Sequence, residues 1–120
     1  MNSFMNKHFN HVQGAVQEDK ACEYLVKVKK YKILERNFKS NIGEIDIIAS
    51  DKKTIVFVEV KYRTSAKFGL GREAVNEHKI IKIRNTALSY LKRNSLLDSA
   101  VRFDVMDILN DKICYIENAF

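Results

Sequence analysis

The chain has 120 residues, with 21 Lys and Arg against 15 Asp and Glu, a formal net charge of +6 and no proline. A chain of this length buries roughly two thirds of its surface as one domain, so two domains are excluded and neither disulfides nor a structural metal is required. No apolar run approaches the ~20 residues that a membrane-spanning helix needs. Met1 to His11 lacks the apolar segment of a signal peptide. We therefore expect a cytoplasmic protein with no membrane association.

The charge and the cysteines restrict the class of partner. An excess of positive charge favours an anionic partner, most often nucleic acid, because a basic surface attracts phosphates over long distances. A lysine-rich solvated surface is the alternative. Cys22 and Cys114 lie far apart, with no paired Cys or His spacing, so neither a zinc site nor a redox motif is indicated. We expect two reduced thiols in the core.

A helix and a strand are predicted after a flexible lead-in over residues 1–10. Alternation of polar and apolar residues from Tyr31 to Phe38 indicates the strand, which ends at the turn Ser40-Asn41. The helix ends at Lys29-Lys30, and its apolar residues recur at helical spacing. These residues are Val12, Ala15, Ala21, Cys22, Leu25 and Val28.

An antiparallel hairpin is predicted next. Its strands are Gly43 to Ala49 and Thr54 to Tyr62, joined by the polar turn Ser50 to Lys53. The second strand contains the nearly continuous apolar run Ile55 to Val58, which is typical of a central strand buried on both faces.

A loop and a second helix follow the hairpin. Arg63 to Arg72 is rich in Ser, Gly and charge, which favours a loop. From about Glu73 to Asn94 the pattern is that of an amphipathic helix. Its apolar stripe consists of Ile80, Ile83, Ala87, Tyr90 and Leu91.

A second hairpin is predicted at the end of the chain. Val101 to Leu109 and Lys112 to Ile116 read as strands around the turn Asn110-Asp111. The order α-β-β-β-α-β-β predicts an α/β fold with a mixed sheet flanked by helices, over residues 11–120 as one domain. We expect Arg102 and Asp104, on one face of the first of these strands, to form a structural ion pair.

Charged side chains in the first predicted hairpin are the main candidates for chemistry. Side chains at i and i+2 of a strand share a face, so Glu59 and Lys61 point the same way, as do Glu44 and Asp46. The hairpin would make Asp46 and Glu59 neighbours. Two carboxylates suit Mg²⁺ or Mn²⁺, which take oxygen ligands and keep waters, and Lys61 would contact phosphate or water. The alternative is that Lys61 only neutralises the carboxylates, and Glu44 either supports Asp46 or is solvated.

Glu18 is a third candidate carboxylate. It projects within the apolar stripe of the first predicted helix, which would deliver it to a site formed by two strands. The alternative is a partly exposed glutamate stabilised by the helix dipole.

Several motifs together resemble the YraN-like family UPF0102, and the similarity spans nearly the whole chain. They are Gly14-x3-Glu18-x2-Ala21-x3-Leu25, Arg36-Asn37, Gly43-Glu44-Ile45-Asp46-Ile47-Ile48, Val56-Phe57-Val58-Glu59-Val60-Lys61-x-Arg63, Phe68-Gly69, Arg102-Phe103-Asp104-Val105 and Ala119-Phe120.

This resemblance implies a restriction-endonuclease-like fold of the PD-(D/E)XK class, similar to archaeal Holliday-junction resolvases. Asp46, Glu59 and Lys61 match the catalytic signature of the class, and Glu18 matches the glutamate on the first helix of the resolvases. Ile45 stands where the signature has proline, a change that leaves the carboxylate in place. Resolvases are dimers, so the resemblance also implies a homodimer.

The function expected from this resemblance is that of a metal-dependent nuclease acting on DNA, including branched intermediates. Asp46, Glu59, Glu18 and the carbonyl of Val60 are expected to hold Mg²⁺ or Mn²⁺ beside the scissile phosphodiester. Basic residues near the site are candidates for phosphate contacts: Arg63, Lys67, Arg72, Lys79 and Lys82. The alternatives are a non-catalytic module that binds nucleic acid or a protein, and a subunit of a larger DNA-processing assembly.

Overall fold

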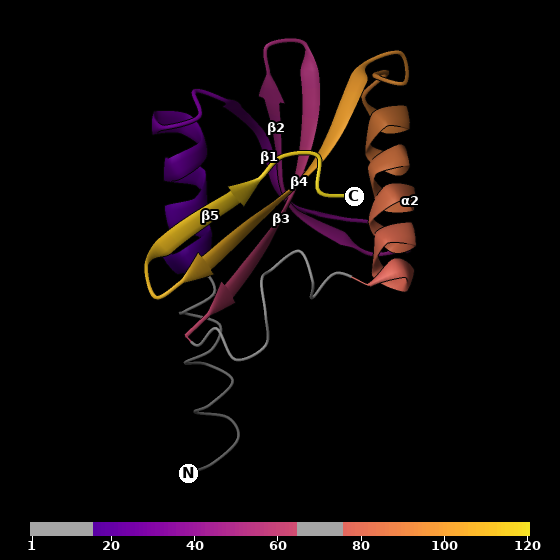
Figure 1. Cartoon of the computed structure of the whole chain (residues 1–120). Coiled ribbons are helices and arrows are strands. Elements are labelled where there is room, and N and C mark those ends of the chain that lie inside the picture. Colours follow the sequence, from indigo (N-terminus) through magenta and orange to yellow (C-terminus); the bar gives the residue numbers. More distant parts are fainter. Residues whose placement is uncertain (1–15, 65–75) are drawn as a thin grey trace.

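A mixed five-stranded sheet lies between two helices in the computed structural model, which describes residues 16–64 and 76–120 (Figure 1). The N-terminal helix is described over residues 16–27, and α2 runs from Glu77 to Arg93. The five strands are β1 (Lys32–Lys39), β2 (Glu44–Asp51), β3 (Thr54–Arg63), β4 (Ala100–Leu109) and β5 (Lys112–Ile116). The predicted order of elements and the α/β fold class are confirmed.

The strands lie in the sheet in the order in which they occur in the chain. β1, β2 and β3 pair antiparallel, β4 pairs parallel to β3, and β5 pairs antiparallel to β4. A parallel pair needs a crossover connection, and α2 lies in the connection between β3 and β4. β3 is therefore central, and Val56, Phe57 and Val58 are almost completely buried, as the apolar run predicted.

Each face of the sheet packs against one helix. The α2 face contains Phe57 and Tyr90, whose rings meet edge to face with centroids 6.0 Å apart. The face under the N-terminal helix contains Leu25 and Val58, both fully buried. Alternation along β3 assigns Phe57 and Glu59 to the α2 face and Val58 and Val60 to the other face. Glu59 and, two residues later, Lys61 therefore lie on the α2 face.

The first hairpin differs in length from its prediction. Ser50 pairs with Ile55 and Asp51 with Thr54, so β2 continues two residues beyond the predicted end at Ala49. The turn is reduced to Lys52 and Lys53, and Lys52 has a left-handed φ of 57°. The pairing of the two strands is antiparallel, as predicted.

Two residues of the predicted apolar pattern and core, Val28 and Cys114, are exposed. Val28 has 61% of its surface exposed because helical structure ends at residue 27, and the chain then reverses at Lys30 with a φ of 63°. Cys114 lies exposed on β5, and Cys22 is only partly buried. Both cysteines carry free thiols, but the prediction of a core position was wrong for Cys114.

The second helix begins with a defined cap. Asn76 accepts a hydrogen bond from the backbone N–H of Lys79 at 2.9 Å, which satisfies one of the free amides of the first turn. The predicted start at Glu73 lies outside the described residues. None of the helices in residues 16–64 and 76–120 is long and apolar enough to cross a membrane.

Candidate functional site

β2 and β3 separate at Asp46. Their paired residues run from Asp51 with Thr54 to Ile47 with Val58, and the pairing stops there. Beyond this point the Asp46 side chain replaces the backbone of β2 as the acceptor. Its Oδ2 accepts a hydrogen bond from the Val60 backbone N–H at 2.8 Å. The N–H and C=O of one strand residue point toward the same neighbouring strand. The Val60 carbonyl therefore also faces the gap beside Asp46.

The sheet is distorted where this gap opens. Ile45 packs in the core under α2 and Ile47 in the core under the N-terminal helix, although residues at i and i+2 of a regular strand share a face. On β1, Asn37 lies between the residues paired with Ile45 and Ile47, and it has a left-handed φ of 53°. Asparagine tolerates this conformation better than most residues do. Asp46 thus occupies an irregular position between two buried isoleucines.

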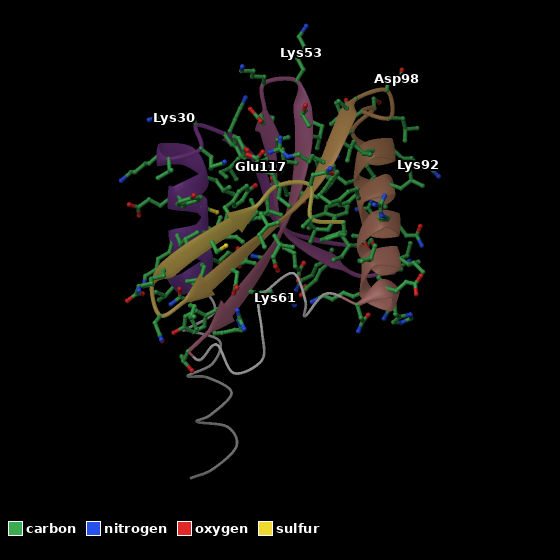
Figure 2. The ribbon with its side chains drawn as sticks, in the orientation of Figure 1. Lys30, Lys53, Lys61, Lys92, Asp98 and Glu117 are labelled. Carbon is green, nitrogen blue, oxygen red and sulfur yellow. The ribbon has the colours of Figure 1, made fainter. Side chains whose placement is uncertain are left out.

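Glu59 is paired with two lysines on the α2 face. Its Oε1 lies 3.5 Å from the Nζ of Lys61 on the same strand and 3.1 Å from the Nζ of Lys79 in the first turn of α2. Glu59 is buried, so its charge depends on these partners. Figure 2 shows Lys61 toward the end of the sheet where α2 begins. The predicted common orientation of Glu59 and Lys61 is confirmed by their ion pair.

A pocket of about 170 Å³ opens over these residues. Gly43 forms one wall, where an added Cβ would lie 3.2 Å from Oγ1 of Thr86 on α2. A water occupies about 30 Å³, so the pocket has room for several waters or for a hydrated cation. The lining consists of Gly43, Glu44, Asp46, Glu59, Lys79, Lys82 and Ile83.

The pocket perturbs the acidity of its groups. Burial, together with the negative charge of Glu59, raises the pKa of Asp46 to about 7 in spite of the hydrogen bond from Val60. Burial and the neighbouring Lys79 ammonium lower the pKa of Lys61. Groups of like charge therefore lie close together, Asp46 beside Glu59 and Lys61 beside Lys79. Groups perturbed in this way occur mostly at functional sites, although structural ion networks also produce them.

The raised pKa of Asp46 predicts a pH-dependent stability. The folded pKa of about 7 lies above the ordinary value of 3.8, so the folded protein binds this proton more tightly than the unfolded chain. Its contribution is complete below the ordinary value and is lost as the pH rises toward 7. We expect Asp46→Asn to raise the free energy of unfolding in EDTA at pH 8 by about 3 kcal/mol relative to wild type.

Urea denaturation of both proteins between pH 4 and pH 8 measures this difference. The two stabilities should converge toward the acid end of the range, where Asp46 is neutral. A difference that stays constant over the range would contradict the assignment.

Glu18 is not brought to the pocket. Its Oε1 accepts hydrogen bonds from Nε of Arg36 at 3.1 Å and from Nδ2 of Asn37 at 2.6 Å, both on β1. Asp46, by contrast, is influenced by Glu59, Glu44 and Lys61. Glu18 also belongs to the helix on the opposite face of the sheet from α2. Its role as a metal ligand is not supported by these contacts and stays a prediction.

The predicted phosphate contacts divide into three groups. Lys79 and Lys82 line the pocket. Lys67 and Arg72 lie outside the described residues. Arg63 is paired within the sheet: its Nε and Nη2 donate to the two carboxylate oxygens of the buried Asp107 at 3.2 and 2.6 Å, and 14% of its side chain is exposed. A phosphate contact by Arg63 is not supported by these bonds and stays a prediction.

Glu44 lies at the rim of the pocket. It is exposed, it lines the opening, and its negative charge adds to the rise in the Asp46 pKa. The structure shows Glu44 solvated, and its support of Asp46 stays a prediction. The pairing of Lys79 with Glu59 was not predicted from the sequence. Its only local signal was that Lys79 precedes the buried Ile83 by one helical turn.

The pocket offers a few oxygen atoms that could act as ligands to a hard cation. Asp46 Oδ1 and Glu59 Oε2 make no hydrogen bond with any of the described residues, and the Val60 carbonyl faces the same gap. Oxygen donors of this kind suit Mg²⁺ or Mn²⁺, which complete their coordination with water and phosphate. In residues 16–64 and 76–120, however, no three His, Cys, Asp or Glu side chains converge as ligands. The site therefore offers two carboxylates rather than three.

Comparison with known proteins gives a family. The model of "Uncharacterised protein family UPF0102" matches residues 17–108. A UPF0102 protein of Fusobacterium nucleatum, FN1370, is 50% identical over 105 residues, which cover 88% of this chain and 87% of that protein. A UPF0102 protein of Persephonella marina is 46% identical over 112 residues, covering 93% of this chain and 96% of that protein.

One solved structure is also similar. The structure titled "Crystal structure of SSO0001" has a TM-score of 0.46 and 17% sequence identity, with 91% of this chain and 52% of that chain covered. This chain thus spans about half the length of that structure. With the family model matching most of its length and relatives near 50% identity, the chain belongs to the YraN-like family UPF0102.

Proposed function

We propose that this protein is a metal-dependent phosphodiester hydrolase acting on nucleic acid, with DNA as the first substrate to test. The observation that carries the proposal is the juxtaposition of Asp46 and Glu59 in one pocket, with the ammonium groups of Lys61 and Lys79 beside them. A pair of buried carboxylates is unfavourable unless a cation compensates for it. The net charge of +6 supports a polyanionic substrate.

Asp46, Glu59 and the Val60 carbonyl would hold the Mg²⁺ or Mn²⁺. When bound, such a cation lowers the pKa of a water and offsets the charge that develops on the phosphate in the transition state. Asp46 is positioned for this by its bond to the Val60 N–H. The carbonyl of the same residue is thereby kept toward the gap.

The lysines would act on water and phosphate. Lys61, with its lowered pKa, lies on the same face as Glu59 and can orient a water or donate to a phosphate oxygen. Lys82 is exposed at the pocket and makes no ion pair within the part of the chain that the structure describes. It is therefore available for a phosphate of the substrate backbone.

One observation favours a second function. Glu59 is already neutralised by two lysines, and the described residues hold only two converging carboxylates. In this alternative the same residues form a structural ion network, and the protein binds nucleic acid or a protein partner without cleaving it. Metal affinity separates the two functions, because a structural network has no need to bind Mn²⁺.

The test is a cleavage assay with the purified protein. Linear duplex, single-stranded, flapped and four-way-junction DNA are incubated with Mg²⁺, Mn²⁺ or EDTA, together with Asp46→Ala and, as a control, Asp98→Ala. Asp98 is an exposed carboxylate in the turn after α2, distant from Lys61 in Figure 2. Cleavage that needs both the metal and Asp46, and survives in the control, supports the proposal. No cleavage and no Mn²⁺ binding would favour the alternative.

A further inference from the structure

Two ammonium groups share a single oxygen atom of Glu59. The Nζ of Lys79 is 3.1 Å and the Nζ of Lys61 3.5 Å from Oε1 of this carboxylate. Two cations this close repel each other, and they are held there because the buried charge of Glu59 attracts both. A divalent cation that used Glu59 as a ligand would meet this positive charge. The repulsion from the cation makes it unfavourable to hold both ammonium groups beside Glu59, so cation binding favours the release of one lysine.

The two lysines differ in their freedom to move. Lys61 lies on the central strand, and 23% of its side chain is exposed. Lys79 lies in the first turn of α2, with 36% of its side chain exposed at the pocket opening. A lysine has a flexible four-carbon stem, so Lys79 can swing into solvent with its ammonium fully hydrated. Lys79 is therefore the partner that leaves Glu59 more easily.

We infer that Lys79 is a displaceable counter-ion, which neutralises Glu59 in the metal-free protein and is released by an incoming divalent cation to contact a nucleic-acid phosphate. This inference rests on the proposed function and adds that the binding of the cation and the binding of nucleic acid are coupled. The cation frees Lys79 for the nucleic acid, and a phosphate that holds Lys79 away from Glu59 favours the cation. By thermodynamic linkage the two effects on affinity are equal.

The first test measures Mn²⁺ affinity without nucleic acid, by calorimetry or electron paramagnetic resonance. Lys79→Met is expected to bind Mn²⁺ about tenfold more tightly than wild type, equivalent to ~1.4 kcal/mol. Lys82→Met is the matched control within the pocket, because Lys82 lines it without pairing to Glu59. We expect this control to gain less than about threefold from the general loss of positive charge. Lys92→Met, at the far end of the same helix (Figure 2), should leave the affinity unchanged.

A charge-conserving variant tests whether the gain in Mn²⁺ affinity comes from the loss of the positive charge at position 79. Lys79→Arg retains the positive charge, and its guanidinium can hold the Glu59 carboxylate through two parallel hydrogen bonds. We expect it to bind Mn²⁺ no more tightly than wild type. The urea midpoint of each variant verifies that it is folded.

The second test measures DNA affinity with and without the cation, by stopped-flow anisotropy before turnover. With Mn²⁺, Lys79→Met should weaken binding and reduce the slope of log affinity against log salt by about one. In EDTA the slope should be nearly unchanged, because Lys79 is then occupied by Glu59. Lys82→Met should reduce the slope in both conditions.

The outcomes separate this inference from the function on which it rests. If wild type binds Mn²⁺ and cuts DNA but Lys79→Met binds Mn²⁺ no more tightly than Lys92→Met, the displacement of Lys79 is overturned and the nuclease survives. If neither wild type nor Lys79→Met binds Mn²⁺, both are overturned.

Discussion

Replacing Asp46 by asparagine is expected to reduce the cleavage rate by about a thousandfold or more, a loss of ~4 kcal/mol of transition-state stabilisation. The asparagine side chain has nearly the same shape, and its oxygen can still accept the hydrogen bond that the Val60 N–H donates to Asp46. What the substitution removes is the negative charge beside Glu59. The cation would then have one charged ligand in place of two.

Binding and cleavage should respond differently to this change. Because Asp46→Asn removes a negative charge from the pocket, the affinity for DNA in EDTA should be retained or slightly increased. Single-turnover cleavage and anisotropy on the same preparation measure the two quantities. Glu44→Gln is the matched control, since Glu44 is an exposed carboxylate at the same pocket, and we expect it to lose less than about tenfold in rate. Cleavage by Asp46→Asn at the wild-type rate would refute the assigned site.

Replacing Asp104 by alanine is expected to lower the free energy of unfolding by about 3–5 kcal/mol. Asp104 is completely buried on β4, and its carboxylate accepts hydrogen bonds from Nε of Arg102 at 2.9 Å and from the backbone N–H of Asn118 at 2.9 Å. The Tyr115 hydroxyl donates a further bond to it. The predicted structural pair of Arg102 and Asp104 is confirmed. Its removal would leave a guanidinium and an amide without their acceptor.

The hydrogen-bond network around Asp104 makes the loss of stability larger than that of the Arg102–Asp104 ion pair alone. Arg102 also donates to Tyr31 at 2.6 Å and to Asp51 at 3.2 Å. Burial, together with the bond to Asp104, raises the pKa of Tyr115 well above its ordinary value. Each of these groups is oriented by the others, so alanine at position 104 disturbs the contact of β4 with β5 and with the start of β1.

Urea denaturation followed by circular dichroism measures this loss. Glu23→Ala is the control, because Glu23 forms an exposed pair with Lys27 along the N-terminal helix, and such pairs contribute less than about 0.5 kcal/mol. An Asp104→Ala protein with the urea midpoint of the control would show that the network contributes nothing to stability.

Local patterns in the sequence were sufficient to predict the helices and strands and part of the candidate site. Alternation and helical spacing depend on neighbouring residues alone, and they predicted the strands, both hairpins and the central position of β3. The same alternation placed Glu59 and Lys61 on one face and Val58 on the other, as observed. The predicted hairpin also allowed Asp46 and Glu59 to be neighbours, and the charge of Glu59 does act on Asp46.

Contacts between distant elements were decided by the tertiary structure. Which lysine of α2 meets Glu59 depends on how the crossover helix packs over the sheet, and the spacing within that helix does not contain this information. Arg63 lies two residues after Lys61, and the parallel pairing of β3 with β4 places it against the buried Asp107. Glu18 has the periodicity of a buried helical residue but bonds to β1, because its helix covers the opposite face of the sheet.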